Sequence, residues 1–266
     1  MLTIGVSMMK NSIDIGPETV RHMLEHVDQV WVLDNNSTDG TGEALRSINA
    51  GNRLVVIDDE EIGYYQSAKM TNLANNAWAA NSMRSCCFVP FDDDERWEPI
   101  DKEMVIADVL NDLFSESDAR IAEVKLYDYR CTSKDIHGAL SPFDRMVWRS
   151  REPTPLPKVA VRWSNGCVIR QGNHSAFVPG EPAPTPAELI IRHYPLRSPE
   201  HMARKAVQGK KAYDATDLPF EQGQHWREWG AHYERGGMDA INEIFYQWYY
   251  FDDPASSGLV LDPARP

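Results

Sequence analysis

Residues 86–95 read C-C-F-V-P-F-D-D-D-E, an apolar run that ends in four consecutive acidic residues. An apolar run this short, stopped by polar residues, predicts a buried strand over Cys86–Phe91. Ligands of open α/β sheets bind beyond the carboxyl ends of the strands, where this strand delivers its carboxylates. In an extended segment, Asp92 and Asp94 point to the same side and offer oxygen ligands for magnesium or manganese. We therefore predict a clamp for a metal and a diphosphate, with a solvated acidic turn as the alternative.

Strands and helices alternate on both sides of this stretch. The predicted strands are Thr3–Met8, Gln29–Leu33, Leu54–Ile57, Cys86–Phe91 and Ile121–Tyr127, and the predicted helices are Pro17–Val27, Tyr65–Asn81 and Pro99–Phe114. This alternation indicates βαβ units and an α/β fold with a mostly parallel central sheet and helices on both faces. The loops after Met8, Leu33 and Phe91 are then the candidate binding loops.

The pattern changes after residue 130. Residues 1–130 predict a nucleotide-binding half, and residues 131–251 predict an acceptor-side half packed on the same sheet. In this second half we expect strands at Met146–Trp148, Val159–Trp163, Cys167–Ile169 and Leu189–His193, and helices at Pro199–Tyr213, Pro219–Glu234 and Met238–Tyr250. The domain therefore ends in a helical portion, and residues 252–266 are expected to form a loose tail.

Charge is distributed unevenly along the 266 residues, whose formal net charge is -13. Residues 140–211 carry 12 basic and 5 acidic side chains, whereas residues 1–139 carry 12 and 25. The overall acidity opposes nucleic-acid binding, but the basic middle suits a phosphate-bearing donor or an anionic acceptor. No apolar run approaches the roughly 20 residues that span a bilayer. We expect no integral membrane segment and a cytoplasmic protein.

Three motifs in the first half resemble those of family-two glycosyltransferases and their relatives with the GT-A fold. They are I-G-V-S-M-M-K-N at 4–11, V-W-V-L-D-N-N-S-T-D-G-T at 30–41 and F-V-P-F-D-D-D-E at 88–95. The second half is similar through N-G-C-V-I-R-Q-G-N-H at 165–174 and R-H-Y-P-L-R-S at 192–198. The resemblance implies a GT-A-like fold, a nucleotide-sugar donor bound by residues 1–130, and transfer of a sugar to a hydroxyl acceptor.

The same resemblance assigns roles to donor-site residues. It implies that Asp34 or Asp39 contacts the nucleotide base, with Asn36 in the same loop, and that Ser7 lies beside the nucleoside. Asp92 would meet the ribose or the metal and Asp94 would coordinate the metal, while His193 would complete the metal or diphosphate site. The implied cofactors are manganese or magnesium and a nucleotide-diphosphate sugar, with a UDP-sugar as the first choice. Lys69, Arg192 and Arg197 could add positive charge for the diphosphate.

The sequence leaves the catalytic base open. An inverting transfer needs a carboxylate or histidine within hydrogen-bond reach of the acceptor hydroxyl. His174 follows a turn-like segment, Glu181 lies in a Pro-rich loop, and Asp144 is a third possibility. The clear Glu-then-Asp pair that is usual in the family is missing here, so the stereochemical outcome stays open as well.

Four functions compete. The first is a metal-dependent glycosyltransferase whose acceptor is a saccharide, lipid-linked or protein hydroxyl. The second keeps the donor but transfers to hydroxylated bases in DNA, as in viral DNA modification, and the basic middle segment motivates it. The third is a nucleotidyltransferase, since a similar sheet with paired acids can hold a nucleoside triphosphate. The fourth is an inactive nucleotide-sugar-binding module.

Overall fold

The computed structural model describes residues 1–136, 138 and 141–264. The chain forms two compact units. The first unit comprises Met1–Glu60, Gln66–Tyr127 and Pro153–His193, and the second comprises Glu61–Tyr65, Asp128–Glu152 and Tyr194–Pro266. The residues expected on the acceptor side thus contribute to both units.

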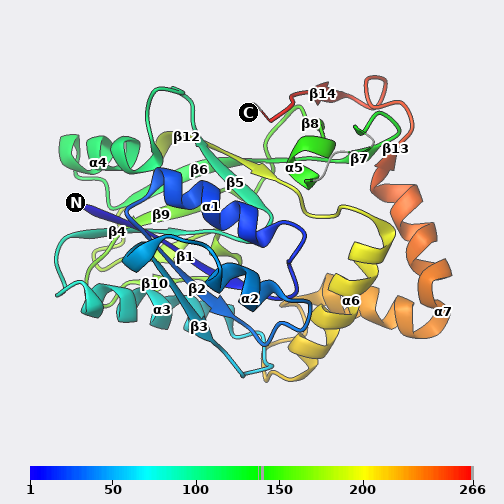
Figure 1. The fold of residues 1–266 in the computed structure, drawn as a ribbon, viewed down its shortest axis with the longest axis horizontal. Coiled ribbons are helices and arrows are strands. Elements are labelled where there is room, and N and C mark those ends of the chain that lie inside the picture. The colour runs from blue at the N-terminus through cyan, green and yellow to red at the C-terminus, as the bar shows by residue number, and fades with distance from the viewer. Residues whose placement is uncertain (137, 139–140, 265–266) are drawn as a thin grey trace. The chain divides into compact units, whose positions relative to one another are not determined.

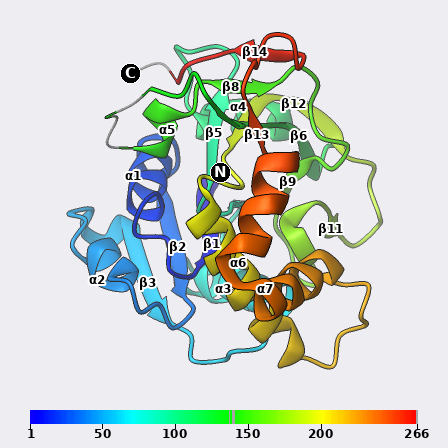
Figure 2. The ribbon, with the colours of Figure 1, turned by 90° about the vertical axis from the view of Figure 1, so that its right-hand side faces the viewer.

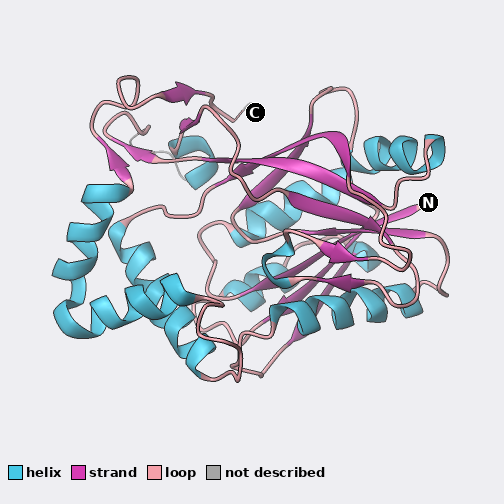
Figure 3. Ribbon diagram, turned by 180° about the vertical axis from the view of Figure 1, so that it is seen from behind, coloured by secondary structure: helices cyan, strands magenta, loops and turns pink. Residues whose placement is uncertain are grey.

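Among the described residues of the first unit, eight strands form one sheet in the order β3-β2-β1-β4-β9-β6-β12-β5 (Figure 1). They are β1 (Leu2–Met9), β2 (Gln29–Asp34), β3 (Leu54–Asp58), β4 (Cys86–Pro90), β5 (Glu95–Pro99), β6 (Ile121–Asp128), β9 (Lys158–Arg162) and β12 (Thr185–His193). Seen from behind, these strands run together as a twisted band (Figure 3).

Strand direction divides this sheet into two parts. The neighbours β3, β2, β1 and β4 are parallel, as the βαβ pattern predicts. β9 is antiparallel to β4 and to β6, and β12 is antiparallel to β5. The predicted α/β class is therefore confirmed. Its parallel part comes from the N-terminal strands, and strands from later in the chain extend the sheet.

Helices cover both faces of the sheet, as predicted. α1 (Gly16–His26), α2 (Thr41–Arg46) and α4 (Ile106–Glu116) pack on one face, and α3 (Gln66–Ala80) packs on the other. Within β2, Val32 joins the first apolar core and Leu33 joins the second, because successive side chains of a strand point to opposite faces. Each face thus has its own core.

The sequence pattern gave no sign of β5. The predicted helix Pro99–Phe114 starts later, since α4 begins at Ile106; Pro99 ends β5, and residues 100–105 form bends and turns. Trp97 in β5 is fully buried, and β5 pairs with β12 so that His193 lies opposite Glu95. Burial of the tryptophan on the face of α4 and the hydrogen bonds to β12 both favour a strand here.

Short elements complete the first unit beside α3. They are η1 (Gly51–Arg53), β10 (Val168–Ile169), η2 (Gln171–Asn173) and β11 (Ala176–Phe177). α3 is tied to this segment because Ser67 Oγ donates to the carbonyl of Ile169 at 2.6 Å. The amide of Gly172 donates to Gln66 Oε1 at 2.7 Å. The 168–174 segment is therefore anchored to the start of α3.

The second unit is built on two long helices. Its elements are β7 (Cys131–Thr132), α5 (Pro142–Arg145), β8 (Trp148–Ser150), α6 (Pro199–Asp214), α7 (Gln224–Trp248), β13 (Tyr250–Phe251) and β14 (Leu259–Leu261). α6 and α7 pack side by side (Figure 2). β14, inside the expected loose tail, pairs antiparallel with β8. Tyr129 and Tyr194 stack in the core of this unit, with ring centroids 4.5 Å apart.

The helical C-terminal portion is confirmed. Two helices were predicted, over Pro219–Glu234 and Met238–Tyr250, and α7 consists of two helical segments that meet at a kink at Gly237, whose φ of 58° and ψ of -142° are not helical. Glycine adopts positive φ without the steric penalty of a side chain, so Gly237 can take the conformation that this kink requires. Among the described residues, no helix combines the length and apolar character needed to cross a bilayer.

Candidate active site

The acidic segment sits in the connection between β4 and β5. The amide of Phe91 still donates to the carbonyl of Val6 at 3.0 Å, which fixes the start of the connection against β1. The next residues do not stay extended, because 93 and 94 form a turn that ends where β5 begins. The alternation expected for an extended segment therefore does not apply, and Asp92 and Asp94 have different surroundings.

Asp92 and Glu95 face a buried lysine. Lys158, the first residue of β9, has its ammonium 2.6 Å from Asp92 Oδ2 and 2.7 Å from Glu95 Oε1. The Lys158 side chain is 4% exposed, whereas that of Asp92 is 27% exposed. Burial lowers the pKa of Lys158, but the Asp92 and Glu95 carboxylates outweigh this effect and raise the pKa above its ordinary value. Lys158 is thus a cation at neutral pH.

The second oxygen of Asp92 also has partners within the chain. Asn173 Nδ2 donates to Asp92 Oδ1 at 3.0 Å, and Gln66 Nε2 donates to the same oxygen at 3.4 Å. Lys158 in turn donates to the carbonyl of Gly172 at 2.9 Å. The acidic turn, β9 and the 171–174 segment are therefore joined by one hydrogen-bonded network centred on Asp92 and Lys158.

Asp94 and His193 form a separate pair. Asp94 Oδ1 lies 3.6 Å from His193 Nε2, and their side chains are 3% and 20% exposed. The pairing of β5 with β12 creates this contact, because it places His193 opposite Glu95, the neighbour of Asp94. A carboxylate oxygen and an imidazole nitrogen at this separation can share a metal ion or a proton.

The donor set fits a divalent metal with two protein ligands. Asp94 and His193 supply one oxygen and one nitrogen, while the oxygens of Asp92 are engaged by Lys158 and Asn173. Within the described part of the chain, no group of three or more His, Cys, Asp or Glu side chains could hold a metal ion. A metal held by one or two protein ligands takes its remaining ligands from substrate phosphates and water.

The loop after β2 is closed by its own side chains. Asp39 Oδ1 accepts from the amide of Thr41 at 3.0 Å, and Asp39 Oδ2 accepts from the amide of Ile13 at 3.1 Å. Asp34 Oδ1 accepts from the amide of Ser37 at 3.2 Å. Asn36 is exposed, with a positive φ of 55°. Asp34 thus bonds within the loop after β2, and Asp39 also ties this loop to the loop after β1.

Ser7 and Lys69 lie on the elements that flank this loop. Ser7 is fully buried in β1, and among the described residues its Oγ has no hydrogen-bond partner. The ammonium of Lys69 in α3 lies 2.7 Å from Asp59 Oδ2, just after β3. Arg197 belongs to the second unit, where its guanidinium donates to the carbonyl of Tyr194 at 3.2 Å.

The candidate bases differ in how they are held. His174 Nδ1 lies 2.9 Å from the carbonyl oxygen of Pro157. A carbonyl only accepts, so Nδ1 carries the proton and Nε2 is the acceptor of the neutral ring. Burial lowers the pKa of His174, and the nearby Lys158 lowers it further. Glu181 is exposed in the loop between β11 and β12, and Asp144 belongs to α5 in the second unit.

The predicted residues Asp92, Asp94, His193 and His174 belong to this region, but three members of the network carry no sequence prediction. They are Lys158, Gln66 and Asn173. Lys158 had a usable signal, since a lysine opening an otherwise apolar strand is a candidate for a buried partner of a carboxylate. Gln66 and Asn173 had no such signal in the sequence, because a single Asn or Gln is far more often at the surface.

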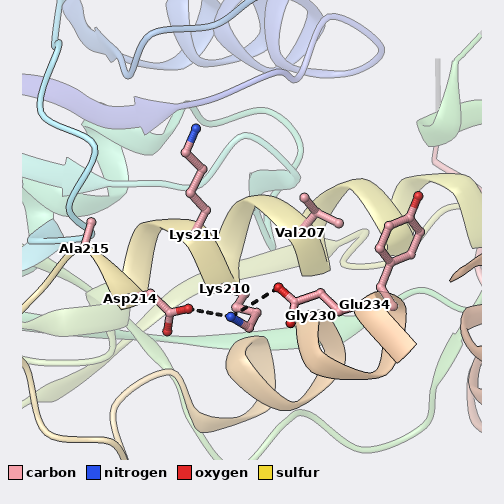
Figure 4. Close-up of a pocket in the computed structure, with 8 residues that line it drawn as sticks. Val207, Lys210, Lys211, Asp214, Ala215, Gly230 and Glu234 are labelled. Atoms are coloured by element: carbon pink, nitrogen blue, oxygen red, sulfur yellow. Dashed lines mark hydrogen bonds and ion pairs between the residues drawn. The ribbon is translucent and has the colours of Figure 1, made fainter. Parts of the chain in front are cut away.

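A separate cavity of about 720 Å³ lies in the second unit between α6 and α7 (Figure 4). Its walls include Lys210, whose ammonium pairs with Asp214 at 2.6 Å and Glu234 at 3.3 Å. None of the residues that line it was predicted as a site residue. Asp214 and Glu234 are exposed and both pair with Lys210, so this cavity is not the candidate active site.

Neither a known protein-family model nor a curated protein matches the sequence. Among solved structures, S. aureus TarS 1-349 in complex with UDP is similar at 12% identity and a TM-score of 0.44, covering 100% of this chain and 97% of that chain. The TarS complex with UDP-GlcNAc gives the same values. Mannosyl-3-phosphoglycerate synthase from Rubrobacter xylanophilus is 20% identical, with a TM-score of 0.31, and covers 49% of this chain and 41% of that chain. At these values, the likeness carries no conclusion about the chemistry of this chain.

Proposed function

We propose that this chain is a glycosyltransferase that moves a sugar from a nucleotide-diphosphate donor to a hydroxyl acceptor. The observation that carries the proposal is the Asp94–His193 pair, 3.6 Å apart at the carboxyl ends of β4 and β12 and beside the Asp92 network. This is the place where open α/β sheets bind ligands. The resemblance of segments 4–11, 30–41 and 88–95 to family-two glycosyltransferases supports the same class.

Asp94 and His193 are the proposed holders of a manganese or magnesium ion. When bound, the ion supplies positive charge for the diphosphate that departs from the sugar. The chain's own contribution is to orient these two side chains through the pairing of β5 with β12. Because Asp94 is nearly buried, it has little freedom to leave this orientation. Asp92 and Lys158 brace the turn from the other side.

His174 is the proposed base for an inverting transfer, and Glu181 is the alternative. Nδ1 of His174 is held by the carbonyl of Pro157, which leaves Nε2 to take the proton of the acceptor hydroxyl. Its lowered pKa favours the neutral ring that a base requires. As the acceptor oxygen bonds to the anomeric carbon, the bond to the diphosphate breaks and Nε2 holds the released proton.

The acceptor is proposed to be a saccharide, lipid-linked or protein hydroxyl. The DNA alternative depended on the basic segment 140–211, but several of its cations are paired within the chain. Arg192 contacts Glu98 at 3.0 Å, Lys158 is buried against Asp92, and Arg149 contacts Asp262 at 2.6 Å. These cations do not form a surface for a phosphate backbone, which weakens the DNA alternative.

The test is a thermal-shift panel of UDP-, GDP-, CMP- and dTDP-linked sugars, each with manganese and with a chelator. Specific binding raises the unfolding temperature by mass action. We expect one nucleotide to raise it, and we expect the chelator and Asp94→Asn to remove that increase. Asp118→Asn, the same change at an exposed site, is the matched control. No increase with any donor would contradict the proposal.

A second measurement decides the acceptor class. Retention on a DNA column at low salt that falls steeply with added salt would favour the DNA alternative. We expect no retention, because the net charge is -13 and the cations named above are paired.

A further inference from the structure

The structure contains a buried cation that the glycosyltransferase resemblance does not assign. Lys158 contacts three groups on two segments: Asp92 and Glu95 in the acidic segment, and the carbonyl of Gly172 in the loop beside α3. Burying an ammonium group costs several kcal/mol unless the surrounding groups compensate for it. Here two carboxylates and one carbonyl lie within 2.9 Å of its nitrogen, which is full coordination for an ammonium.

We propose that Lys158 is a positioning residue that locks Asp92 into an internal ion pair, fixes the acidic turn against the His174 loop, and leaves metal binding to Asp94 and His193. The proposal rests on the proposed function for its metal. The proposal also gives different roles to Asp92 and Asp94, which look equivalent in the sequence. Asp92 acts through Lys158 and Asn173, whereas Asp94 lies against His193.

The first support is the state of the two Asp92 oxygens. Oδ2 accepts from Lys158 at 2.6 Å, and Oδ1 accepts from Asn173 at 3.0 Å. A metal ion on Asp92 would lie close to the Lys158 ammonium, and the repulsion between the two cations opposes its binding there.

The second support is the path from Lys158 to the proposed base. Lys158 follows Pro157, whose carbonyl holds His174 Nδ1, and its ammonium bonds to Gly172, two residues before His174. Both ends of the lysine therefore contact the groups that orient the histidine. A shift of Lys158 would move the His174 ring and the acidic turn together, which is how one residue can set the distance between base and metal ligand.

The first experiment measures manganese binding to the free protein by electron paramagnetic resonance. We expect Asp94→Asn to weaken binding at least about 30-fold, and Asp92→Asn to change it by less than about threefold. Equal losses in the two variants would overturn the inference, because Asp92 would then be a ligand. Unchanged binding in Asp94→Asn would instead contradict the metal site of the proposed function.

The second experiment removes the cation with Lys158→Gln or Lys158→Met. Without its partner, Asp92 becomes available to the metal and the local positive charge is lost. Manganese should therefore bind at least about threefold tighter, and adding Asp92→Asn should reverse the gain. Weaker or unchanged manganese binding would overturn the inference. Lys158→Arg keeps the charge and should stay near the wild-type affinity.

A double-mutant cycle tests the contact without metal or donor. Lys158→Met and Asp92→Asn are measured by urea unfolding, singly and together. If the residues are paired, the midpoint of the double variant will be higher than the sum of the two single shifts predicts. Additive shifts would overturn the pairing. If the wild-type protein binds no manganese, the metal assignment is wrong. The double-mutant cycle alone then tests whether Lys158 and Asp92 form an ion pair.

Discussion

Two polar segments follow strands that flank β1, and they look alike in sequence. Segment 34–41 ends β2 and segment 92–95 follows β4. In the first, Asp39 accepts hydrogen bonds from nearby backbone amides. In the second, Asp92 is paired with Lys158 of β9, and Asp94 faces His193 of β12. The first segment is held by backbone amides of its own loop and of the loop after β1, whereas the second is completed by charged side chains from distant strands.

This difference indicates which acidic segment is built for chemistry. Carboxylates bonded to local amides hold a loop together, as helix caps do. Carboxylates placed opposite a buried ammonium and an imidazole create a field that a charged ligand can use. The two segments therefore differ in what their carboxylates contact: backbone amides in one, and a lysine and a histidine side chain in the other. The following predictions test this difference.

The largest expected effect is on activity at Asp94. Asp94→Asn should lower sugar transfer about 100-fold or more, because an amide is a poor replacement for an anionic metal ligand. The urea midpoint should stay near that of the wild type. Turnover is measured as release of the nucleoside diphosphate from the donor. Near-normal turnover would show that Asp94 is not an active-site residue.

At Asp39 the expected effect is on stability. Asp39→Ala removes the bonds to Thr41 and Ile13, which should lower the free energy of unfolding by about 2 kcal/mol. Urea unfolding measures this loss, with Asp118→Ala as the control. If stability is unchanged while donor binding disappears, Asp39 contacts the nucleotide instead, and the contrast between the segments breaks down.

Mild acid should destabilise the protein through His22, not through the acidic segments. Burial lowers the pKa of His22 from 6.5 to about 3, with Arg96 adding to the effect. The unfolded chain therefore binds a proton that the folded one excludes. Stability is complete above the unfolded pKa and falls by about 2 kcal/mol between pH 7 and pH 5.

Chemical denaturation between pH 7 and pH 5 measures how steeply the free energy of unfolding changes with pH. His26, whose pKa is also lowered by burial, adds to it. His22→Gln retains a donor for the Trp97 carbonyl but does not titrate, so its slope should be smaller. An equal slope in the variant would assign the effect to other groups, the acidic segments among them.

The smallest expected effect is at Gly172, between Lys158 and His174. Its φ of 76° is unfavourable for other residues, and an added Cβ would lie 2.6 Å from the His174 ring. Gly172→Ala should cost about 1–2 kcal/mol of stability and lower kcat by displacing the ring. Gly180→Ala, at an exposed glycine with open space around it, controls for the positive φ alone. Unchanged kcat would argue against His174 as the base.

Local pattern predicted most of the first unit. β1, β2 and α1 lie within a residue or two of their predicted bounds, because apolar periodicity and helix signals are local properties. β5 was missed because its strand character depends on pairing with β12, which is far away in sequence. The two helical segments of α7 were also predicted, and they meet at Gly237, a residue type that commonly interrupts a helix.

The candidate site, too, was predicted from the sequence only in part. The sequence indicated Asp92, Asp94, His174 and His193, since carboxylates and histidines at strand ends are recognisable types. It did not indicate that Lys158 would pair with Asp92, or that residues 93 and 94 would form a turn.

The sequence by itself determined an α/β fold, a parallel set of N-terminal strands and an acidic segment at a strand end, because each depends on neighbours along the chain. Only the tertiary structure decided that Lys158 meets Asp92 and that His193 meets Asp94. Those contacts follow from β9 lying beside β4 and from β12 pairing with β5. Strand order is set by burial of the whole sheet between its helices, which no local pattern of residues encodes.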